Sequence, residues 1–122
     1  MDKTVLLIED EPNIIEAISF ILSRDGWRVA THSNGVDAVD AVGVRKPDLV
    51  ILDVMLPGRS GFDILRDLRA EAATADLPVL MLTARGQVKD REMAETLGAS
   101  RFMAKPFSNA EVLEAVRDLV RP

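Results

Sequence analysis

The residues of this sequence that could do chemistry are carboxylates, a hydroxyl and an ammonium, each placed at the end of a short apolar run. They are Glu9, Asp10, Asp53, Thr83 and Lys105. Carboxylates held close together repel each other, which raises the pKa of at least one of them unless a cation intervenes. A hard divalent ion with oxygen ligands removes this repulsion, and Mg²⁺ suits a site that also handles phosphate. With one histidine and no cysteine in the chain, a zinc or copper site is not expected.

The same residue types fit phosphoryl transfer. A carboxylate such as Asp53 can act as a nucleophile and form an acyl phosphate. The reaction needs mainly positioning and charge neutralisation, which a metal ion, a lysine and a hydroxyl would supply. Each residue also has an ordinary interpretation when taken alone: an acidic pair can begin a helix, Asp53 or Thr83 can cap a turn or helix, and Lys105 can be a solvent-exposed side chain. Their joint occurrence at successive strand ends favours a shared site.

The elements that must position these residues are strands alternating with helices. Unbroken apolar runs at 5–8, 49–52 and 79–82 predict strands buried on both faces, and shorter strands are expected at 27–31 and around residues 102–103. Five such βα units predict a doubly wound, three-layer α/β domain with a parallel sheet, spanning residues 1–122. Ligands of such sheets bind outside the carboxyl ends of the strands, where the residues above are expected to meet.

Helical spacing of apolar residues predicts the helices between these strands. Pro12 can open the first helix, which Gly26 ends. The second helix is expected to carry an apolar stripe of Val36, Val39 and Val42 and to end at Gly43 and Pro47. Two pairs resemble capping boxes, Ser60 with Asp63 and Ser108 with Glu111.

The fourth predicted helix, at 87–97, has the weakest apolar stripe. Its main apolar residues are Val88, Ala94 and Leu97. A helix with so few apolar contacts should be the least firmly docked and the easiest to shift.

Composition and charge exclude several classes of protein. The chain has 122 residues, a net charge of −5 and no run of Lys and Arg longer than two, so binding of nucleic acid by this chain alone is not expected. Its apolar runs are far too short to span a membrane, and its first residues do not resemble a signal peptide. Together with the absence of cysteine, this makes a cytoplasmic location the default expectation.

Several longer motifs carry a family resemblance. They are VLLIEDEP at 5–12, PDLVILD at 47–53, MLPG at 55–58, SGF at 60–62, PVLMLTA at 78–84, LGA at 97–99, and KPF at 105–107 with Phe102 before it. In this order and spacing the chain resembles bacterial response-regulator receiver domains over essentially its whole length. The resemblance implies the flavodoxin-like (βα)5 fold with strand order 2-1-3-4-5.

The resemblance also implies roles for the acidic residues. Asp53 would accept a phosphoryl group from a phosphohistidine on a partner histidine kinase or phosphotransfer protein. Mg²⁺ would be bound by Asp10, Asp53 and the backbone carbonyl of Met55, with Glu9 as an auxiliary or water-mediated ligand. Such a domain assists its own phosphorylation and dephosphorylation but is not a dedicated enzyme.

The remaining roles implied by the resemblance concern the phosphoryl group and the switch. The Thr83 hydroxyl would bond the phosphoryl group, and Lys105 would pair with it after a cis Lys105–Pro106 peptide bond. Thr83 would then move and the ring of Phe102 would turn inward, changing the face made by the fourth helix, fifth strand and fifth helix. Phe102 can also be read as a plain core residue, and it lacks the hydroxyl of the tyrosine often found there.

The resemblance implies partners but does not select among them. The output would be a downstream effector protein or a fused output domain, and a phosphorylation-dependent homodimer is a further candidate. Residues 99–101 are Ala-Ser-Arg, without the acidic residues that pair across the dimers of winged-helix regulators. The sequence leaves open whether this is a stand-alone protein or the receiver part of a longer regulator.

Two rival functions compete with phosphoryl acceptance. A nucleotide-binding or flavodoxin-like domain is one, but the sequence has neither a Walker A loop nor a Gly-x-Gly-x-x-Gly motif after its first strand. A receiver-like module that binds partners without being phosphorylated is the other. The single histidine, His32, is expected to be an ordinary surface residue.

Overall fold

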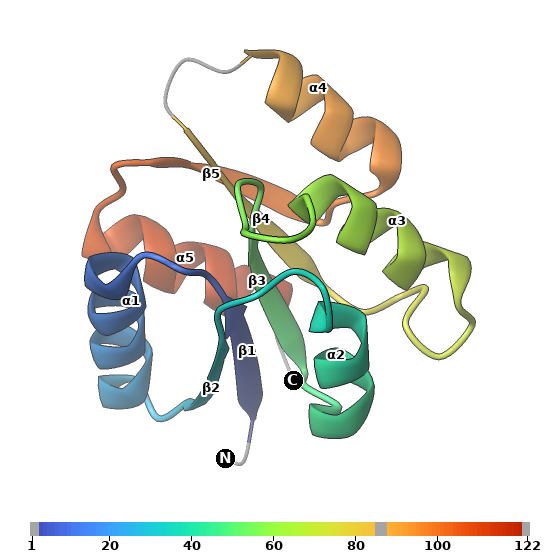
Figure 1. Cartoon of the computed structure of the whole chain (residues 1–122). Helices are drawn as coiled ribbons and strands as arrows, with labels where there is room; N and C mark the ends of the chain where they lie inside the picture. Colours follow the sequence, from blue (N-terminus) through green and yellow to red (C-terminus); the bar gives the residue numbers. More distant parts are fainter. Residues whose placement is uncertain (1–2, 85–87, 121–122) are drawn as a thin grey trace.

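The chain alternates strands and helices throughout the part that the computed structural model describes, residues 3–84 and 88–120 (Figure 1). The strands are β1 (Thr4–Ile8), β2 (Arg28–His32), β3 (Leu49–Asp53), β4 (Val79–Ala84) and β5 (Arg101–Lys105). The helices are α1 (Pro12–Arg24), α2 (Ala38–Arg45), α3 (Gly61–Ala70), α4 (Val88–Leu97) and α5 (Asn109–Leu119).

The strands form one parallel sheet in the order β2-β1-β3-β4-β5, which confirms the predicted fold and strand order. The register brings the carboxyl ends of the strands to a common edge. Ile8 lies beside Leu52, and Asp53 lies beside Leu82. At the next pairing Ala84 lies beside Lys105. The residues that follow β1 and end β3, β4 and β5 therefore lie at one edge of the sheet.

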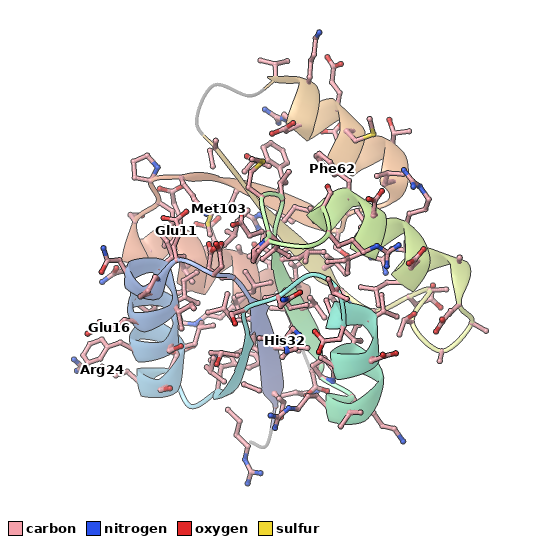
Figure 2. All side chains as sticks on the ribbon, in the orientation of Figure 1. Glu11, Glu16, Arg24, His32, Phe62 and Met103 are labelled. Carbon is pink, nitrogen blue, oxygen red and sulfur yellow. The ribbon has the colours of Figure 1, made fainter. Side chains whose placement is uncertain are left out.

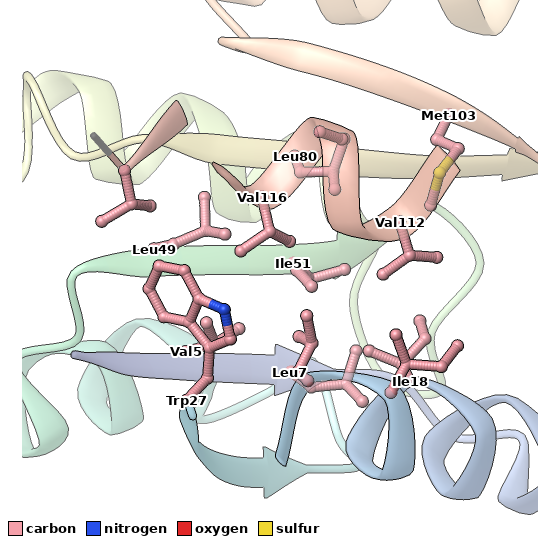
Figure 3. Close-up of a cluster of buried hydrophobic side chains, with 14 of the residues drawn as sticks. Val5, Leu7, Ile18, Trp27, Leu49, Ile51, Leu80, Met103, Val112 and Val116 are labelled. Atoms are coloured by element: carbon pink, nitrogen blue, oxygen red, sulfur yellow. The ribbon is translucent and has the colours of Figure 1, made fainter. Parts of the chain in front are cut away.

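Each face of the sheet carries its own apolar core, because successive side chains of a strand point to opposite faces. The first core packs under α1 and α5 and contains Trp27 among strand residues such as Leu7 and Ile51 (Figure 3). The second packs under α2, α3 and α4 and contains Leu6 and Ile8. Figure 1 shows the same three layers, with the sheet between the two groups of helices.

The two predicted capping boxes have different outcomes. Ser108 and Glu111 form the complete reciprocal pair at the start of α5, with both hydrogen bonds present. Ser60 caps α3 through the N–H of Phe62. The carboxylate of Asp63 instead contacts Arg66, one turn along the helix. The predicted capping box of Ser60 with Asp63 is therefore wrong, although the predicted helix start is right.

Other local predictions are also corrected. Val36 is exposed and precedes α2, and Gly43 lies inside that helix. The helix ends instead at Arg45. Its C-cap residue Lys46 adopts a left-handed φ of 47°, because a residue preceding a proline, here Pro47, avoids the right-handed helical region. Trp27 precedes β2 and is buried, whereas Thr31 within the strand is exposed.

The fourth helix is present but its apolar face is narrower than predicted. Ala94 is buried, Leu97 is half-buried and Val88 is exposed. Position 87, where the helix was expected to begin, lies outside the described residues. No helix in the described part of the chain is both long and apolar enough to cross a membrane.

Candidate functional site

Three polar side chains are buried at the carboxyl edge of the sheet, where the sequence predicts the site. Glu9 is 0% exposed, and Asp53 and Thr83 are each 2% exposed. Glu9 directly follows β1, Asp53 ends β3 and Thr83 lies at the penultimate position of β4. Burial of charged and polar groups costs free energy unless they are paired, so their placement calls for partners inside the site.

The ammonium of Lys105 is the partner that the buried carboxylates share. Its Nζ lies 2.8 Å from Glu9 Oε1 and 3.3 Å from Asp53 Oδ2. It also lies 3.1 Å from Oε1 of Glu11, a side chain that is 58% exposed at the start of α1. The structure thus brings Glu9, Asp53 and Lys105 together, as the sequence predicts, and adds Glu11.

Burial and charge set the electrostatics of the site. Desolvation, followed by the nearby carboxyl of Asp53, raises the pKa of Glu9 above its usual range. Burial and the neighbouring Glu9 also raise the pKa of Asp10. Burial lowers the pKa of the Lys105 ammonium, but the surrounding carboxylates outweigh it and raise the pKa above its usual value. Lys105 is therefore a fixed positive charge among the carboxylates of this edge.

The acidic residues fit a divalent cation. Glu9, Asp10 and Asp53 each offer a carboxylate oxygen, and these oxygens lie within 4.8 Å of one another. Within the described residues, the buried oxygens Glu9 Oε1 and Asp53 Oδ2 accept no hydrogen bond of good geometry. Hard oxygen donors with unused acceptor capacity are what Mg²⁺ prefers.

The loop after β3 holds Asp53 tightly against the start of α3. The N–H of Met55 donates to Asp53 Oδ1 at 3.3 Å, and the N–H of Gly61 donates to the carbonyl of Val54 at 2.9 Å. A Cβ on Gly61 would clash with the carbonyl oxygen of Asp53, so only glycine allows this close approach. Gly58 makes the turn with a φ of +83°.

An open cleft gives access to the acidic edge. Its lining residues are Glu11, Ile14, Asp53, Met55, Ala84, Lys105 and Pro106. The Lys105–Pro106 peptide bond at its rim is cis. Asp53 is thus almost completely buried but still lines the cleft. A phosphodonor that enters the cleft could reach its carboxylate, as a nucleophile requires.

Phe102, the expected switch residue, lies away from this cleft. It is half-buried on β5, and the guanidinium of Arg91 on α4 stacks over its ring at 4.4 Å from the centroid. Beside it, Arg101 pairs with Asp118 on α5 at 3.1 Å. Nothing in the sequence pattern indicated the contact between Arg91 and Phe102.

His32 lies partly exposed and outside the cleft, which agrees with the prediction of a surface residue without a role in the site. Its ring is 24% exposed, and Nε2 lies 2.7 Å from Asp37 Oδ1. The contact ties the end of β2 to the start of α2, and His32 does not line the cleft. His32 therefore has a structural contact outside the site.

Comparison with known proteins identifies the family. The model of the response regulator receiver domain matches residues 5–117. The probable transcriptional regulatory protein TcrX of Mycobacterium tuberculosis is 44% identical over 97% of this chain and 50% of its own length. The phosphate regulon transcriptional regulatory protein PhoB of Escherichia coli is 37% identical over 99% of this chain and 53% of its own length. The chain belongs to the response regulator receiver domain family.

A solved structure supports the same assignment. The receiver domain of the sensor histidine kinase PA1611 from Pseudomonas aeruginosa matches with a TM-score of 0.90 and 29% identity, with all of both chains covered. That structure has a magnesium ion coordinated in its active-site cleft. The present chain spans about half the length of the curated relatives it matches. Membership of the family implies that the chain accepts a phosphoryl group in two-component signalling.

Proposed function

We propose that Asp53 accepts the phosphoryl group, which a partner histidine kinase or phosphotransfer protein supplies from a phosphohistidine. The observation that carries this proposal is the contact of Asp53 Oδ2 with the Lys105 ammonium, at 3.3 Å, in a cleft that Asp53 itself lines. A carboxylate that is buried, faces a cation and is still reachable combines the two requirements of a phosphoacceptor, accessibility and charge neutralisation.

The transfer is an exchange of one bond to phosphorus for another. An oxygen of Asp53 attacks the phosphorus, the phosphorus–nitrogen bond of the phosphohistidine breaks, and the departing imidazole nitrogen keeps the electron pair. The product is an acyl phosphate on Asp53. Lys105, already between the carboxylates, pairs with the phosphoryl oxygens, and the hydroxyl of Thr83 at the end of the neighbouring strand donates a hydrogen bond to them.

Mg²⁺ is the cofactor that the donor set favours. Asp10, Asp53 and the carbonyl of Met55 would hold it, with Glu9 as an auxiliary ligand. Bound there, the ion supplies positive charge against the phosphoryl oxygens. Glu9 also fixes the backbone of the acidic turn, because its Oε2 accepts the N–H of Asp10 at 2.8 Å and that of Glu11 at 3.2 Å.

The output of phosphorylation would be a change in the face made by α4, β5 and α5. Thr83 and Phe102 lie on the neighbouring strands β4 and β5. A movement of Thr83 toward the phosphoryl group can therefore change the position of the Phe102 ring. The helix nearest to Phe102, α4, buries Ala94 and little else among residues 88–97. A weakly docked helix is the element most easily displaced.

We expect the altered face to bind a partner protein or domain. The similar proteins TcrX and PhoB are about twice as long as this chain and are described as transcriptional regulatory proteins. A downstream effector, a fused output domain or a second copy of the chain would bind the altered face. Direct contact of this chain with DNA is not part of the proposal, because its net charge is −5.

Intact mass spectrometry tests the proposal. The chain is incubated with Mg²⁺ and acetyl phosphate, and we expect its mass to increase by one phosphoryl group. We expect no increase when Mg²⁺ is omitted from the reaction. Asp53→Asn should abolish the gain, whereas Asp63→Asn, which changes an aspartate of α3 outside the cleft, should leave it intact. If the wild-type chain gains no phosphoryl group, or if Asp53→Asn still gains one, the proposal fails.

A further inference from the structure

We propose that Glu11 is a positioning residue for Lys105, and that it holds the ammonium toward the rim of the cleft in competition with the phosphoryl group. The inference rests on the proposed function, because it concerns the same cleft and the same lysine. It adds to the site a residue whose side chain neither accepts the phosphoryl group nor belongs to the acidic cluster suited to the metal ion.

The first support is the geometry of the lysine. Lys105 donates a hydrogen bond to Glu11 Oε1 at 3.1 Å, while its contacts with Glu9 and Asp53 reach inward to buried oxygens. Glu9 and Asp53 are almost completely buried, whereas the Glu11 side chain is 58% exposed. The ammonium is therefore held between an inner pair of carboxylates and one outer carboxylate on the rim.

The second support is that the Glu11 side chain has no role in its own helix. Glu11 occupies the N-cap position of α1, but its side chain makes no capping hydrogen bond there. The side chain contacts instead a lysine 94 residues away in the sequence. Figure 2 shows Glu11 at the end of α1 that lies near the carboxyl edge of the sheet. The carboxylate is thus oriented by the cleft and not by the helix start.

A competition follows from these contacts. An acyl phosphate on Asp53 replaces the single negative charge of the carboxylate with about two negative charges, spread over three acceptor oxygens beside the lysine. To pair with them fully, the ammonium must give up an outer contact, and Glu11 is the most exposed of its partners. An exposed ion pair is weak, so the competition should change the phosphorylation rate by roughly two- to fivefold and not by orders of magnitude.

The first test measures the lysine itself, without metal or phosphodonor. In protein labelled with ¹³C-lysine, NMR relaxation gives an order parameter for the terminal methylene of Lys105, with Lys46 and Lys89 as internal references. Glu11→Gln should lower the order parameter of Lys105 and leave those of the references unchanged. Glu16→Gln is the matched control, because it removes an equal charge from the outer side of the same helix (Figure 2).

The second test measures the reaction. With Mg²⁺ and acetyl phosphate, Glu11→Gln should be phosphorylated roughly two- to fivefold faster than the wild-type chain, and Glu16→Gln at the wild-type rate. An unchanged Lys105 order parameter in Glu11→Gln overturns the inference, and so does an equal acceleration in Glu16→Gln, which would indicate general charge repulsion. A wild-type chain that is never phosphorylated would refute the proposed function, and the NMR comparison would then decide alone whether Glu11 holds Lys105.

Discussion

Two helices flank β5, and they are attached to the sheet very differently. Helix α5 buries Val112, Ala115 and Val116, begins with a complete capping box and is tied to the end of α1 by the ion pair between Arg117 and Asp25. Helix α4 buries Ala94, and its residues Val88 and Met93 are exposed. One strand thus has a firmly docked neighbour on one side and a loosely docked neighbour on the other.

The difference shows where the fold can change at low cost. The contact of α4 with β5 includes the stacking of Arg91 on Phe102, and beyond its end Arg69 of α3 donates to the carbonyl of Gly98 at 2.9 Å. Each contact is made by the guanidinium of an arginine and not by a buried apolar side chain, so breaking it costs little free energy. The acidic cleft, by contrast, is built on buried strand ends. A change of charge in the cleft can therefore displace α4 while α5 stays in place.

Matched valine substitutions should give the largest contrast between the two helices. Val116→Ala removes buried methyl groups from α5 and should lower the free energy of unfolding by about 2 kcal/mol. Val88→Ala, at an exposed position of α4, should change it by less than about 0.5 kcal/mol. Urea unfolding measures both. Equal losses for the two variants would contradict the proposed difference in docking.

The ion pair of α5 with Asp25 should have a smaller effect that depends on pH. Arg117 and then Trp27 hold the pKa of Asp25 below its usual value of 3.8. The folded state therefore favours the carboxylate, and this adds stability above pH 3.8 that is lost as the pH falls through the lower, folded-state pKa. Asp25→Asn should thus destabilise the chain at pH 7, by less than Val116→Ala does.

The control for the ion pair is the same measurement in acid. The gap in free energy of unfolding between the wild-type chain and Asp25→Asn should be widest at pH 7 and should shrink as the pH falls below 3.8. A gap that stays constant with pH would show that the substitution acts through packing near Trp27 and not through the charge of Asp25.

The stacking of Arg91 on Phe102 should give the smallest effect. An exposed cation–π contact contributes about 0.5 kcal/mol, so Arg91→Ala should speed hydrogen exchange of the α4 amides by about twofold. The amides of α5 should not change, because α5 has its own apolar contacts. If the α5 amides accelerate as much as those of α4, the two helices do not open independently.

Much of the fold was predictable from the sequence because its local signals agree. Four consecutive apolar residues precede Glu9, and four more precede Asp53; so short a run, repeated between helical patterns, favours a strand covered on both faces. Parallel strands then place these acidic residues at one edge. The strand order came from the resemblance to a family, because apolar runs alone do not specify which strands are neighbours.

The features that the sequence did not predict depend on contacts between residues far apart in the chain, or on competition between neighbouring signals that end a helix. Gly43 was expected to end α2, but the helix continues because an interior glycine costs only about 1 kcal/mol and Pro47 imposes the later end. The contact of Glu11 with Lys105 joins residues that only the folded sheet brings together. A third consecutive acidic residue after β1 was the one signal that could have indicated Glu11.

The most direct test of the account is to locate the phosphoryl group chemically. After reaction with acetyl phosphate and Mg²⁺, borohydride reduces an acyl phosphate of aspartate to homoserine, and tandem mass spectrometry of peptides identifies the converted residue. We expect homoserine at position 53 and an unmodified Asp10. Conversion at Asp10, or no conversion in a chain whose intact mass shows phosphorylation, would contradict the assignment of Asp53 as the phosphoacceptor.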